Sequence, residues 1–242
     1  MIYLTGFHAI EERLRSGKGA QALLVAKAPP RSRSILELAA AQHIRIERTG
    51  THELDRVAKD HRGIALEIEE SETRGASFEE SLELLQERER ALAVVLDEIT
   101  DPHNFGAILR SCDQFSADLI VTRTDRTAKH SDVIAKASAG ASAWTPLWSV
   151  PNLPRAVNAL KEAGFWIYGA DTDGEPVWNT KLSGRVALVL GSEGAGISRL
   201  LRECCDGLVS IPCTGRVDSL NVSVAAGVLL YETRRQMSLS QK

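Results

Sequence analysis

Residues 186–196 read VALVLGSEGAG, a run of five apolar residues that passes directly into a glycine-rich turn. A continuous apolar run is typical of a strand that is buried on both faces of a parallel sheet. Ligands of such sheets bind beyond the carboxyl ends of the strands, and glycine lets the backbone approach a ligand closely. The stretch therefore predicts a strand followed by either a ligand-binding loop or a plain tight turn.

Outward from this stretch, apolar runs alternate with segments of helical spacing. Strands are expected at 93–96, 119–121, 165–170, 186–190 and 208–211, and helices at 104–115, 131–138, 151–163 and 219–235. Such alternation indicates a parallel sheet with helices on both faces. No G-x-x-x-x-G-K-[ST] sequence occurs, and no G-x-G-x-x-G follows the first strand. A P-loop and a dinucleotide-binding Rossmann site are therefore excluded.

A polar segment, DPHNFGAILR over residues 101–110, follows the strand expected at 93–96. Its helix has a core stripe spaced i, i+3, i+4, i+7, formed by Phe105, Ile108, Leu109 and Cys112. Arg110 lies outside this stripe. Because residues 106 and 107 are small and helical side chains lean toward the N-terminus, its guanidinium is expected to reach toward Asn104. The alternative is a solvated Arg110 on an exposed face.

Residues 211–227 open as a loop and become a helix that is apolar or small on every side. Such a helix is expected to be buried all round. Ser219 and Asn221 would then stand at a buried helix start, where free N–H groups attract polar ligands. Simple capping of the helix is the alternative for both residues.

The composition changes near residues 69–90, where a polar stretch passes into a charged helix. We therefore divide the chain into a first domain at 1–70, a linker and first helix at 71–90, and a second domain at 91–242. The first domain is expected to be a small α/β sandwich, with helices at 7–15, 34–42 and 51–60 and strands at 22–26, 44–46 and 63–68. It carries 11 Lys and Arg against 10 Asp and Glu, and four of the six histidines. This weak basic bias fits either nucleic-acid binding or a mixed solvated surface.

Bulk properties narrow the protein class. The net charge of −3 argues against a protein that coats nucleic acid without selection. No apolar run approaches the roughly 18 residues of a membrane span, and residues 1–6 lack the features of a signal peptide. We therefore expect a cytoplasmic protein with no membrane attachment. The four cysteines form no C-x-x-C pair, so we expect reduced, mostly buried thiols and no metal site.

The three polar segments together resemble the signature motifs of the SpoU/TrmH family of RNA methyltransferases. The matching residues are Asn104-x-Gly106-x-x-x-Arg110, then Leu190–Gly194, then Ile211-Pro212 with Ser219–Ala225. The resemblance covers about residues 90–236 and implies transfer of a methyl group from S-adenosylmethionine to a ribose 2′-hydroxyl of RNA. It implies an α/β fold: a C-terminal parallel-sheet domain with a deep trefoil knot, preceded by a small α/β RNA-binding domain. It also implies a homodimer with the last helix in the interface.

The resemblance further implies roles for residues around the cofactor. Gly191, Ile211 and Leu220 match the positions whose backbones surround the adenine and ribose of the cofactor. No metal is required, because a sulfonium methyl is already a good electrophile and the acceptor hydroxyl need only be aligned with it.

On the substrate side, the family counterpart of Arg110 is proposed to activate the hydroxyl. A guanidinium is a poor base, with a pKa above about 12, so we expect Arg110 to bind phosphate and stabilise the developing alkoxide. Asn104 would orient Arg110 or the ribose. Glu193, Ser219 and Asn221 would shape the substrate pocket. Arg126, in a polar loop, is either an RNA-phosphate contact or a solvated charge.

Alternatives remain for the substrate and for catalysis itself. The two-domain layout is most similar to family members that methylate a guanosine of large-subunit ribosomal RNA, so structured ribosomal RNA is the favoured partner. A transfer-RNA 2′-O-methyltransferase of the same family is one alternative. A non-catalytic RNA-binding protein on the same fold is another. The complete set of candidate site residues argues against it: Asn104, Arg110, Glu193, Ser219 and Asn221.

Overall fold

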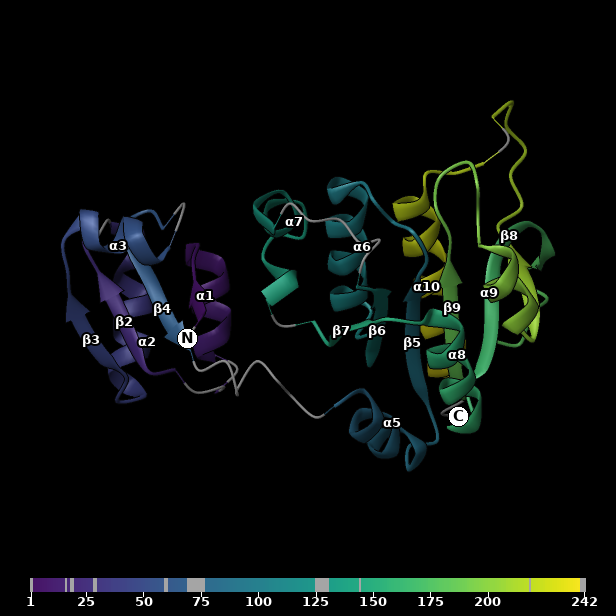
Figure 1. The fold of residues 1–242 in the computed structure, drawn as a ribbon, viewed down its shortest axis with the longest axis horizontal. Coiled ribbons are helices and arrows are strands. Elements are labelled where there is room, and N and C mark those ends of the chain that lie inside the picture. Colours follow the sequence, from purple (N-terminus) through teal and green to yellow (C-terminus); the bar gives the residue numbers. More distant parts are fainter. Residues whose placement is uncertain are drawn as a thin grey trace. The chain divides into compact units, whose positions relative to one another are not determined.

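The computed structural model describes residues 2–15, 17, 20–27, 30–58, 61–68, 77–124, 131–143, 145–217 and 219–239. The chain forms two compact units, Met1–Ser77 and Phe78–Lys242 (Figure 1). Each unit has its own hydrophobic core, and each is described by itself below.

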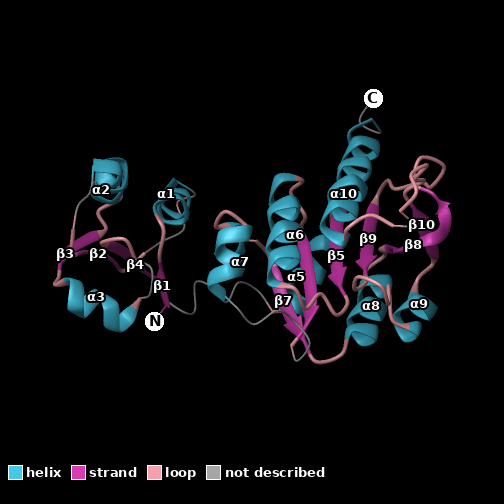
Figure 2. Ribbon diagram, turned by 90° about the horizontal axis from the view of Figure 1, so that it is seen from above, coloured by secondary structure: helices cyan, strands magenta, loops and turns pink. Residues whose placement is uncertain are grey.

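The N-terminal unit is a four-stranded sheet with helices on both faces. Its elements are β1 (Ile2–Leu4), α1 (Phe7–Arg15), β2 (Ala22–Val25), α2 (Arg33–Ala41), β3 (Arg45–Arg48), α3 (Thr51–Val57) and β4 (Ile64–Ile68). The strand order is β1-β4-β2-β3, in which β2 and β3 are parallel and the other pairs antiparallel. Helices α1 and α2 pack on one face and α3 on the other (Figure 2). The expected small α/β domain is confirmed, and β1 is an additional strand too short for its periodicity to be noticed.

The C-terminal unit is built on six parallel strands. Its elements are α5 (Phe78–Gln86), β5 (Ala91–Leu96), α6 (Pro102–Gln114), β6 (Leu119–Arg123), α7 (Ser131–Ala137), β7 (Leu147–Val150), α8 (Leu153–Glu162), β8 (Trp166–Pro176), β9 (Arg185–Leu190), α9 (Arg199–Cys204), β10 (Gly207–Ser210) and α10 (Val222–Leu239). The order is β10-β8-β9-β5-β6-β7. The predicted parallel sheet is confirmed. Strand β7 was not expected, and α10 begins three residues later than predicted.

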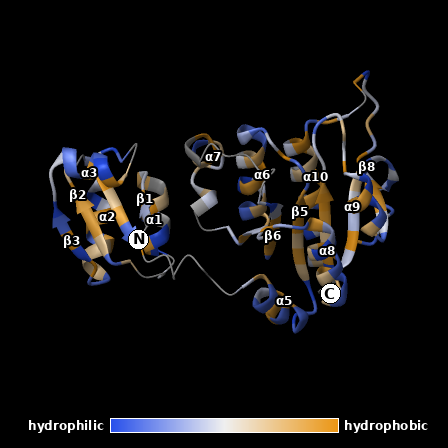
Figure 3. Cartoon of the chain, viewed as in Figure 1, coloured by the Kyte–Doolittle hydropathy of each residue, from blue (hydrophilic) through white to orange (hydrophobic). Residues whose placement is uncertain are grey.

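Apolar side chains cover both faces of this sheet. Along β5, residues 92, 94 and 96 face α6, α7 and α10, whereas residues 91, 93 and 95 face α5, α8 and α9. All six residues of β5 are buried, and β5 and the part of β9 that follows Arg185 are hydrophobic (Figure 3). Burial on two faces is the reason why these strands read as continuous apolar runs in the sequence.

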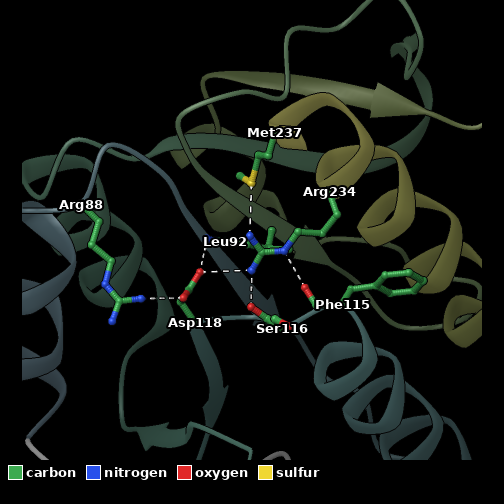
Figure 4. A network of polar contacts seen from close by, with 7 residues as sticks. All are labelled: Arg88, Leu92, Phe115, Ser116, Asp118, Arg234 and Met237. Carbon is green, nitrogen blue, oxygen red and sulfur yellow. Dashed lines mark hydrogen bonds and ion pairs between the residues drawn. The ribbon is translucent and has the colours of Figure 1, made fainter. Parts of the chain in front are cut away.

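Arg234, on α10, fastens that helix to the end of α6 (Figure 4). Its Nε donates to the carbonyl of Phe115 at 2.6 Å, and Nη2 donates to the carbonyl of Ser116. These carbonyls belong to the C-terminal end of α6, where the helix itself leaves acceptors unsatisfied and a cation is favoured. Nη2 also lies 3.3 Å from Asp118, which in turn binds Arg88.

Candidate functional site

A cavity of about 680 Å³ lies beyond the carboxyl end of β9, flanked by the middle of β8 and by β10. Its size is in the range of small-molecule sites, and its position is the one expected of ligands in parallel sheets. The segments that line it are the middle of β8 at 170–172, the glycine-rich turn at 190–196, positions 209, 211 and 213, the loop at 219–222, and residues 225 and 229 of α10. Gly191, Ile211 and Leu220, which the family resemblance singles out for the cofactor, all line it.

The glycine-rich turn is a closed loop. The backbones of Ser192 and Gly196 exchange two hydrogen bonds of 3.0 and 2.9 Å. A Cβ on Gly191 would lie 2.1 Å from the carbonyl carbon of Gly196, and Gly194 has φ +86°. The glycines are thus required by the turn itself, as the tight-turn interpretation holds, and the turn also forms a wall of the cavity.

Three side chains from the three motifs meet at the mouth of this turn. Asn104 donates from Nδ2 to Glu193 Oε1 at 3.0 Å. Asn221 donates from Nδ2 to Asn104 Oδ1 at 3.0 Å and also to Glu193 Oε1. We call Asn104, Glu193 and Asn221 the polar triad. It joins residues that lie 89, 28 and 117 positions apart in the chain.

The orientation of Asn221 within the triad follows from its place before α10. Its Oδ1 accepts from the backbone N–H of Ser223 at 2.9 Å and of Val224 at 3.4 Å, and from the Ser223 hydroxyl. This is N-terminal capping, which satisfies otherwise free helix N–H groups. Because the oxygen is used by the helix, the NH₂ group must face Asn104 and Glu193. The capping interpretation of Asn221 is therefore confirmed, and the same amide also contacts Asn104 and Glu193.

Asn104 is placed by a second cap. Asp101 accepts from the backbone N–H groups of His103 at 3.2 Å and Asn104 at 3.1 Å, and Pro102 occupies the first turn of α6. Proline suits this position because its missing N–H would be unsatisfied there in any case. Asn104 is therefore held in the first turn of α6, half-buried and within reach of the glycine-rich turn.

Arg110 lies as the alternative interpretation expected, on an exposed face of α6, and not toward Asn104. It is exposed on α6 and does not line the cavity. Among the described residues it has no hydrogen bond or ion pair, and the amide of Asn104 is occupied by the triad. The expectation that small residues leave a bare patch for the guanidinium is wrong for Gly106. That glycine is buried, and a Cβ there would lie 2.6 Å from the Cβ of Ala137 on α7.

The other residues singled out in the sequence differ in their exposure and in whether they line the cavity. Ser219 is exposed and lines the cavity next to Leu220. Arg126 lies in 125–130, outside the described residues. Cys112 is buried, and burial raises the pKa of its thiol to about 12. Cys213 is exposed and lines the cavity, so the expectation of a buried thiol is wrong for it.

Two acidic residues at the site were missed by sequence reasoning. Asp97 is buried directly after β5, and its Oδ2 accepts from the N–H of Ser198 at 2.8 Å, which holds the end of the glycine-rich turn. Asp171 lines the cavity and is ion-paired with Arg202 on α9. A carboxylate that directly follows a buried apolar strand was the available signal for Asp97. No local pattern pointed to Asp171.

Within the described ranges, no group of three or more His, Cys, Asp or Glu side chains could hold a metal ion. No described helix combines the length and the apolar character that a membrane crossing requires.

Comparison with known proteins places these features in context. The SpoU rRNA Methylase family model matches residues 91–231, and the model for RNA 2′-O ribose methyltransferase substrate binding matches residues 3–74. A 23S rRNA (guanosine-2′-O-)-methyltransferase RlmB of Neisseria meningitidis is 40% identical over 98% of this chain and 96% of its own length. An uncharacterized tRNA/rRNA methyltransferase of Borreliella burgdorferi is 42% identical over 88% of this chain and 97% of its own. The SpoU methyltransferase AviRb of Streptomyces viridochromogenes, solved with AdoMet, has a TM-score of 0.75 and 26% identity, covering 98% of this chain and 90% of that one.

Proposed function

The chain belongs to the SpoU rRNA methylase family, and from that membership we infer that it transfers a methyl group from S-adenosylmethionine to a ribose 2′-hydroxyl of RNA. The RNA is large-subunit ribosomal RNA, and the acceptor is a guanosine, as the names of its relatives state for those proteins. We assign residues 1–70 to RNA binding, 71–90 to the connection, and 91–242 to catalysis. The single observation that carries the assignment is the polar triad, which brings one residue from each of the three motifs to the mouth of one cavity.

The cavity fits the cofactor in chemistry as well as in size. Its walls combine apolar side chains, among them Leu190, Ile211 and Leu220, with the backbone of the glycine-rich turn. Apolar walls suit an adenine ring, and free backbone groups suit its nitrogens and the ribose hydroxyls. We propose that Gly191, Ile211 and Leu220 hold the adenosine part of the cofactor.

The residues of this chain then have to align the acceptor ribose. When bound, S-adenosylmethionine supplies an electrophilic methyl group on sulfur. The polar triad and Ser219 stand at the cavity mouth and would position the ribose hydroxyl, and alignment of this kind can contribute about 7–11 kcal/mol. In the transfer, the oxygen–methyl bond would form as the sulfur–methyl bond breaks to leave S-adenosylhomocysteine, and the hydroxyl proton would pass to solvent water. Arg110, whose side chain is exposed and without a partner among the described residues, would bind the RNA phosphate and stabilise the negative charge that develops on the oxygen. A residue held permanently cationic suits that role better than the role of a base.

Arg110→Ala tests this role. Transfer should fall at least about 100-fold, since the loss of a single charge-stabilising donor typically costs that much. The melting temperature should stay unchanged, because Arg110 is exposed. Near-normal turnover in this variant would remove Arg110 from the site.

We propose a homodimer formed through α10. Val224, Val228 and Tyr231 are exposed at i, i+4 and i+7, so they form one apolar stripe on that helix. The occupant we expect is the same stripe of a second copy, as a two-fold interface requires. Light scattering of the wild type and of Val228→Asp tests this: the wild type should have twice the monomer mass, and the variant should shift toward monomer.

We also propose the deep trefoil knot of the family. The turn at 190–196 and the loop at 211–221 line the same cavity, and α10 returns from that loop to pack on α6. A continuous experimental chain trace through residues 185–230 tests it, and an unthreaded trace would contradict it.

The reaction itself is tested with an unmethylated 23S rRNA transcript, labelled S-adenosylmethionine and mapping of the product. We expect one 2′-O-methylated guanosine. A transcript with a 2′-deoxy nucleotide at that site should bind only slightly more weakly, because one hydrogen bond contributes roughly 0.5–1.5 kcal/mol, yet yield no product. Methylation of the deoxy transcript would place the acceptor on the base, and preferential methylation of tRNA transcripts would favour the tRNA alternative.

A further inference from the structure

Basic residues gather at one end of the sheet in the N-terminal unit. Strand β2 ends at Val25 and β3 ends at Arg48, and these two residues are partners in the parallel register. Strand β4 begins at Ile64, which is also paired with Val25. The segments that carry Lys27, Arg48 and Arg62 therefore leave the sheet side by side.

Backbone hydrogen bonds tie these segments together. The carbonyl of Gly63 accepts from the N–H of Ala26 at 2.8 Å and of Lys27 at 3.1 Å, and Thr49 N donates to the carbonyl of Val25 at 3.1 Å. Gly63 has φ +92°, and a Cβ there would lie 2.7 Å from the carbonyl oxygen of Lys27. The basic residues thus stand on a well-defined platform. Arg31, in the short 3-10 helix Pro30–Ser32 that leads into α2, follows Lys27 by four residues.

The four cations differ from others in the same unit in having no counter-charge among the described residues. Lys27, Arg31, Arg48 and Arg62 are exposed, and the side chain of none of them has a hydrogen bond or ion pair with a described residue. At the opposite end of the sheet, Arg15 is paired with Glu11 at 2.7 Å and Arg45 with Glu47 at 2.8 Å.

The described carboxylates beside these cations are already engaged. Glu53 accepts from the Thr49 hydroxyl and from the N–H of Gly50 at 3.2 Å, which caps α3. Asp55 binds His61 at 2.9 Å. A surface that concentrates charge of one sign attracts ligands of the opposite sign, so these cations favour the approach of an anion.

We propose that this surface, formed by Lys27, Arg31, Arg48 and Arg62 and called here the sheet-end cation surface, binds the phosphodiester backbone of the substrate RNA. The proposal rests on the proposed function as an RNA methyltransferase and adds where the N-terminal unit makes contact. Phosphate contacts of this kind set the position of the RNA and leave the choice of nucleotide to other groups. They also explain how a chain with a net charge of −3 holds a polyanion: the positive charge is concentrated locally.

Two charge-matched double variants of the full chain test the surface. Arg48→Gln with Arg62→Gln removes two charges from it, and Arg15→Gln with Arg45→Gln removes two paired charges from the opposite end. Binding of an unmethylated 23S rRNA transcript is measured over a salt series. For two lost phosphate contacts, the first variant should bind roughly 10- to 30-fold more weakly at 0.15 M salt, and the slope of log K against log salt should be shallower by about 1.4–1.8. The control should change less than about twofold.

Further measurements separate the possible causes. Cofactor affinity and melting temperature should match the wild type in both variants, and Arg48→Lys with Arg62→Lys should restore RNA binding because it restores the charge. Three outcomes would overturn the proposal: a wild-type salt slope in the first variant, equal losses of binding in both variants, or failure of the Lys pair to restore binding. A surface that binds an acidic protein partner instead of RNA would give the first of these outcomes. If the wild type transfers no methyl group, the proposed function fails, whereas the binding comparison still decides the surface.

Discussion

At the scale of single residues, the amide of Asn221 has two sets of partners. Its oxygen caps α10, and its nitrogen binds Asn104 and Glu193. The cap fixes which way the amide points, so the folding of the helix also sets the donor that faces the cavity mouth. A residue of this kind is sensitive to substitution on both counts, and Glu193 offers the cleaner test of the site because it caps no helix.

Glu193→Gln should slow methyl transfer about tenfold or more at saturating cofactor. The variant loses the charged acceptor of two amide N–H groups, a change that costs roughly 1.5 kcal/mol or more. Single-turnover rates with saturating RNA measure it. Glu203→Gln is the control, because Glu203 is an exposed carboxylate paired with Arg199 away from the cavity. Equal rates in the two variants would show that the triad has no part in the reaction.

The cysteines should differ sharply in reactivity toward iodoacetamide. Burial raises the pKa of Cys112 to about 12 and of Cys205 to about 11. Since the thiolate is the reactive form, both thiols stay protonated below pH 9 and gain reactivity only as the pH rises toward those values. Cys213, exposed at the cavity, should be labelled first at pH 7.5, and S-adenosylmethionine should slow its labelling. Mass spectrometry of the labelled peptides checks this, and labelling of Cys112 first would contradict it.

At the scale of elements, α6 and α10 lie parallel and are joined at both ends. Asn104 and Asn221 meet at their starts, and Arg234 binds the carbonyls that follow α6. Between these joints, Gly227 of α10 lies close to the hydroxyl of Ser111. The hydrogen bonds of Arg234, at the end of α10 away from the cavity, therefore help to hold the start of this helix in place beside the cavity.

Arg234→Ala should lower the free energy of unfolding by about 2 kcal/mol, because it leaves the carbonyls of Phe115 and Ser116 without their charged donor, whereas Asp118 keeps its ion pair with Arg88. Arg234→Lys should restore little, because an ammonium cannot reproduce the fork of the guanidinium. Urea unfolding measures both. Arg235→Ala, at the neighbouring residue whose exposed side chain pairs with Glu232, should lower the free energy of unfolding clearly less than Arg234→Ala, because solvent screens that pair. A loss at Arg235 as large as that at Arg234 would contradict the clamp.

At the scale of the whole molecule, the chain consists of two units with separate cores. The cavity and the polar triad belong entirely to the C-terminal unit. Cofactor binding should therefore be a property of that unit alone, whereas the recognition of RNA should need both.

Removal of residues 1–77 should leave the affinity for S-adenosylmethionine within about twofold of the full chain, and should reduce transfer to 23S rRNA by at least about tenfold. The expected loss reflects the phosphate contacts that the N-terminal unit would supply. Calorimetry with the cofactor and steady-state kinetics with the transcript measure the two effects. Full activity of the shortened chain would show that the N-terminal unit does not bind the substrate.

The amino-acid sequence by itself determined the parts of this protein that depend on local pattern. The apolar runs of β5 and β9 predicted the parallel sheet, because strands buried on two faces have no polar face to show. The stripe of Phe105, Ile108, Leu109 and Cys112 predicted the buried side of α6, and all four are buried. The three motifs predicted the family.

Only the tertiary structure decided which of the candidate residues meet. Asn104, Glu193 and Asn221 touch because β5, β9 and the start of α10 come together, and no periodicity records contacts between residues 89 or 117 positions apart. Local reasoning placed Arg110 toward Asn104. In the structure, however, α7 occupies the space beside Gly106, and the side-chain amide of Asn104 is hydrogen-bonded to residues from distant segments. Asp171 lies on the long strand β8 and lines the cavity, but no local sequence pattern predicted that position. Local preferences follow from neighbours in the chain, whereas the partners of a site residue depend on the crossings and register of elements that are far apart in sequence.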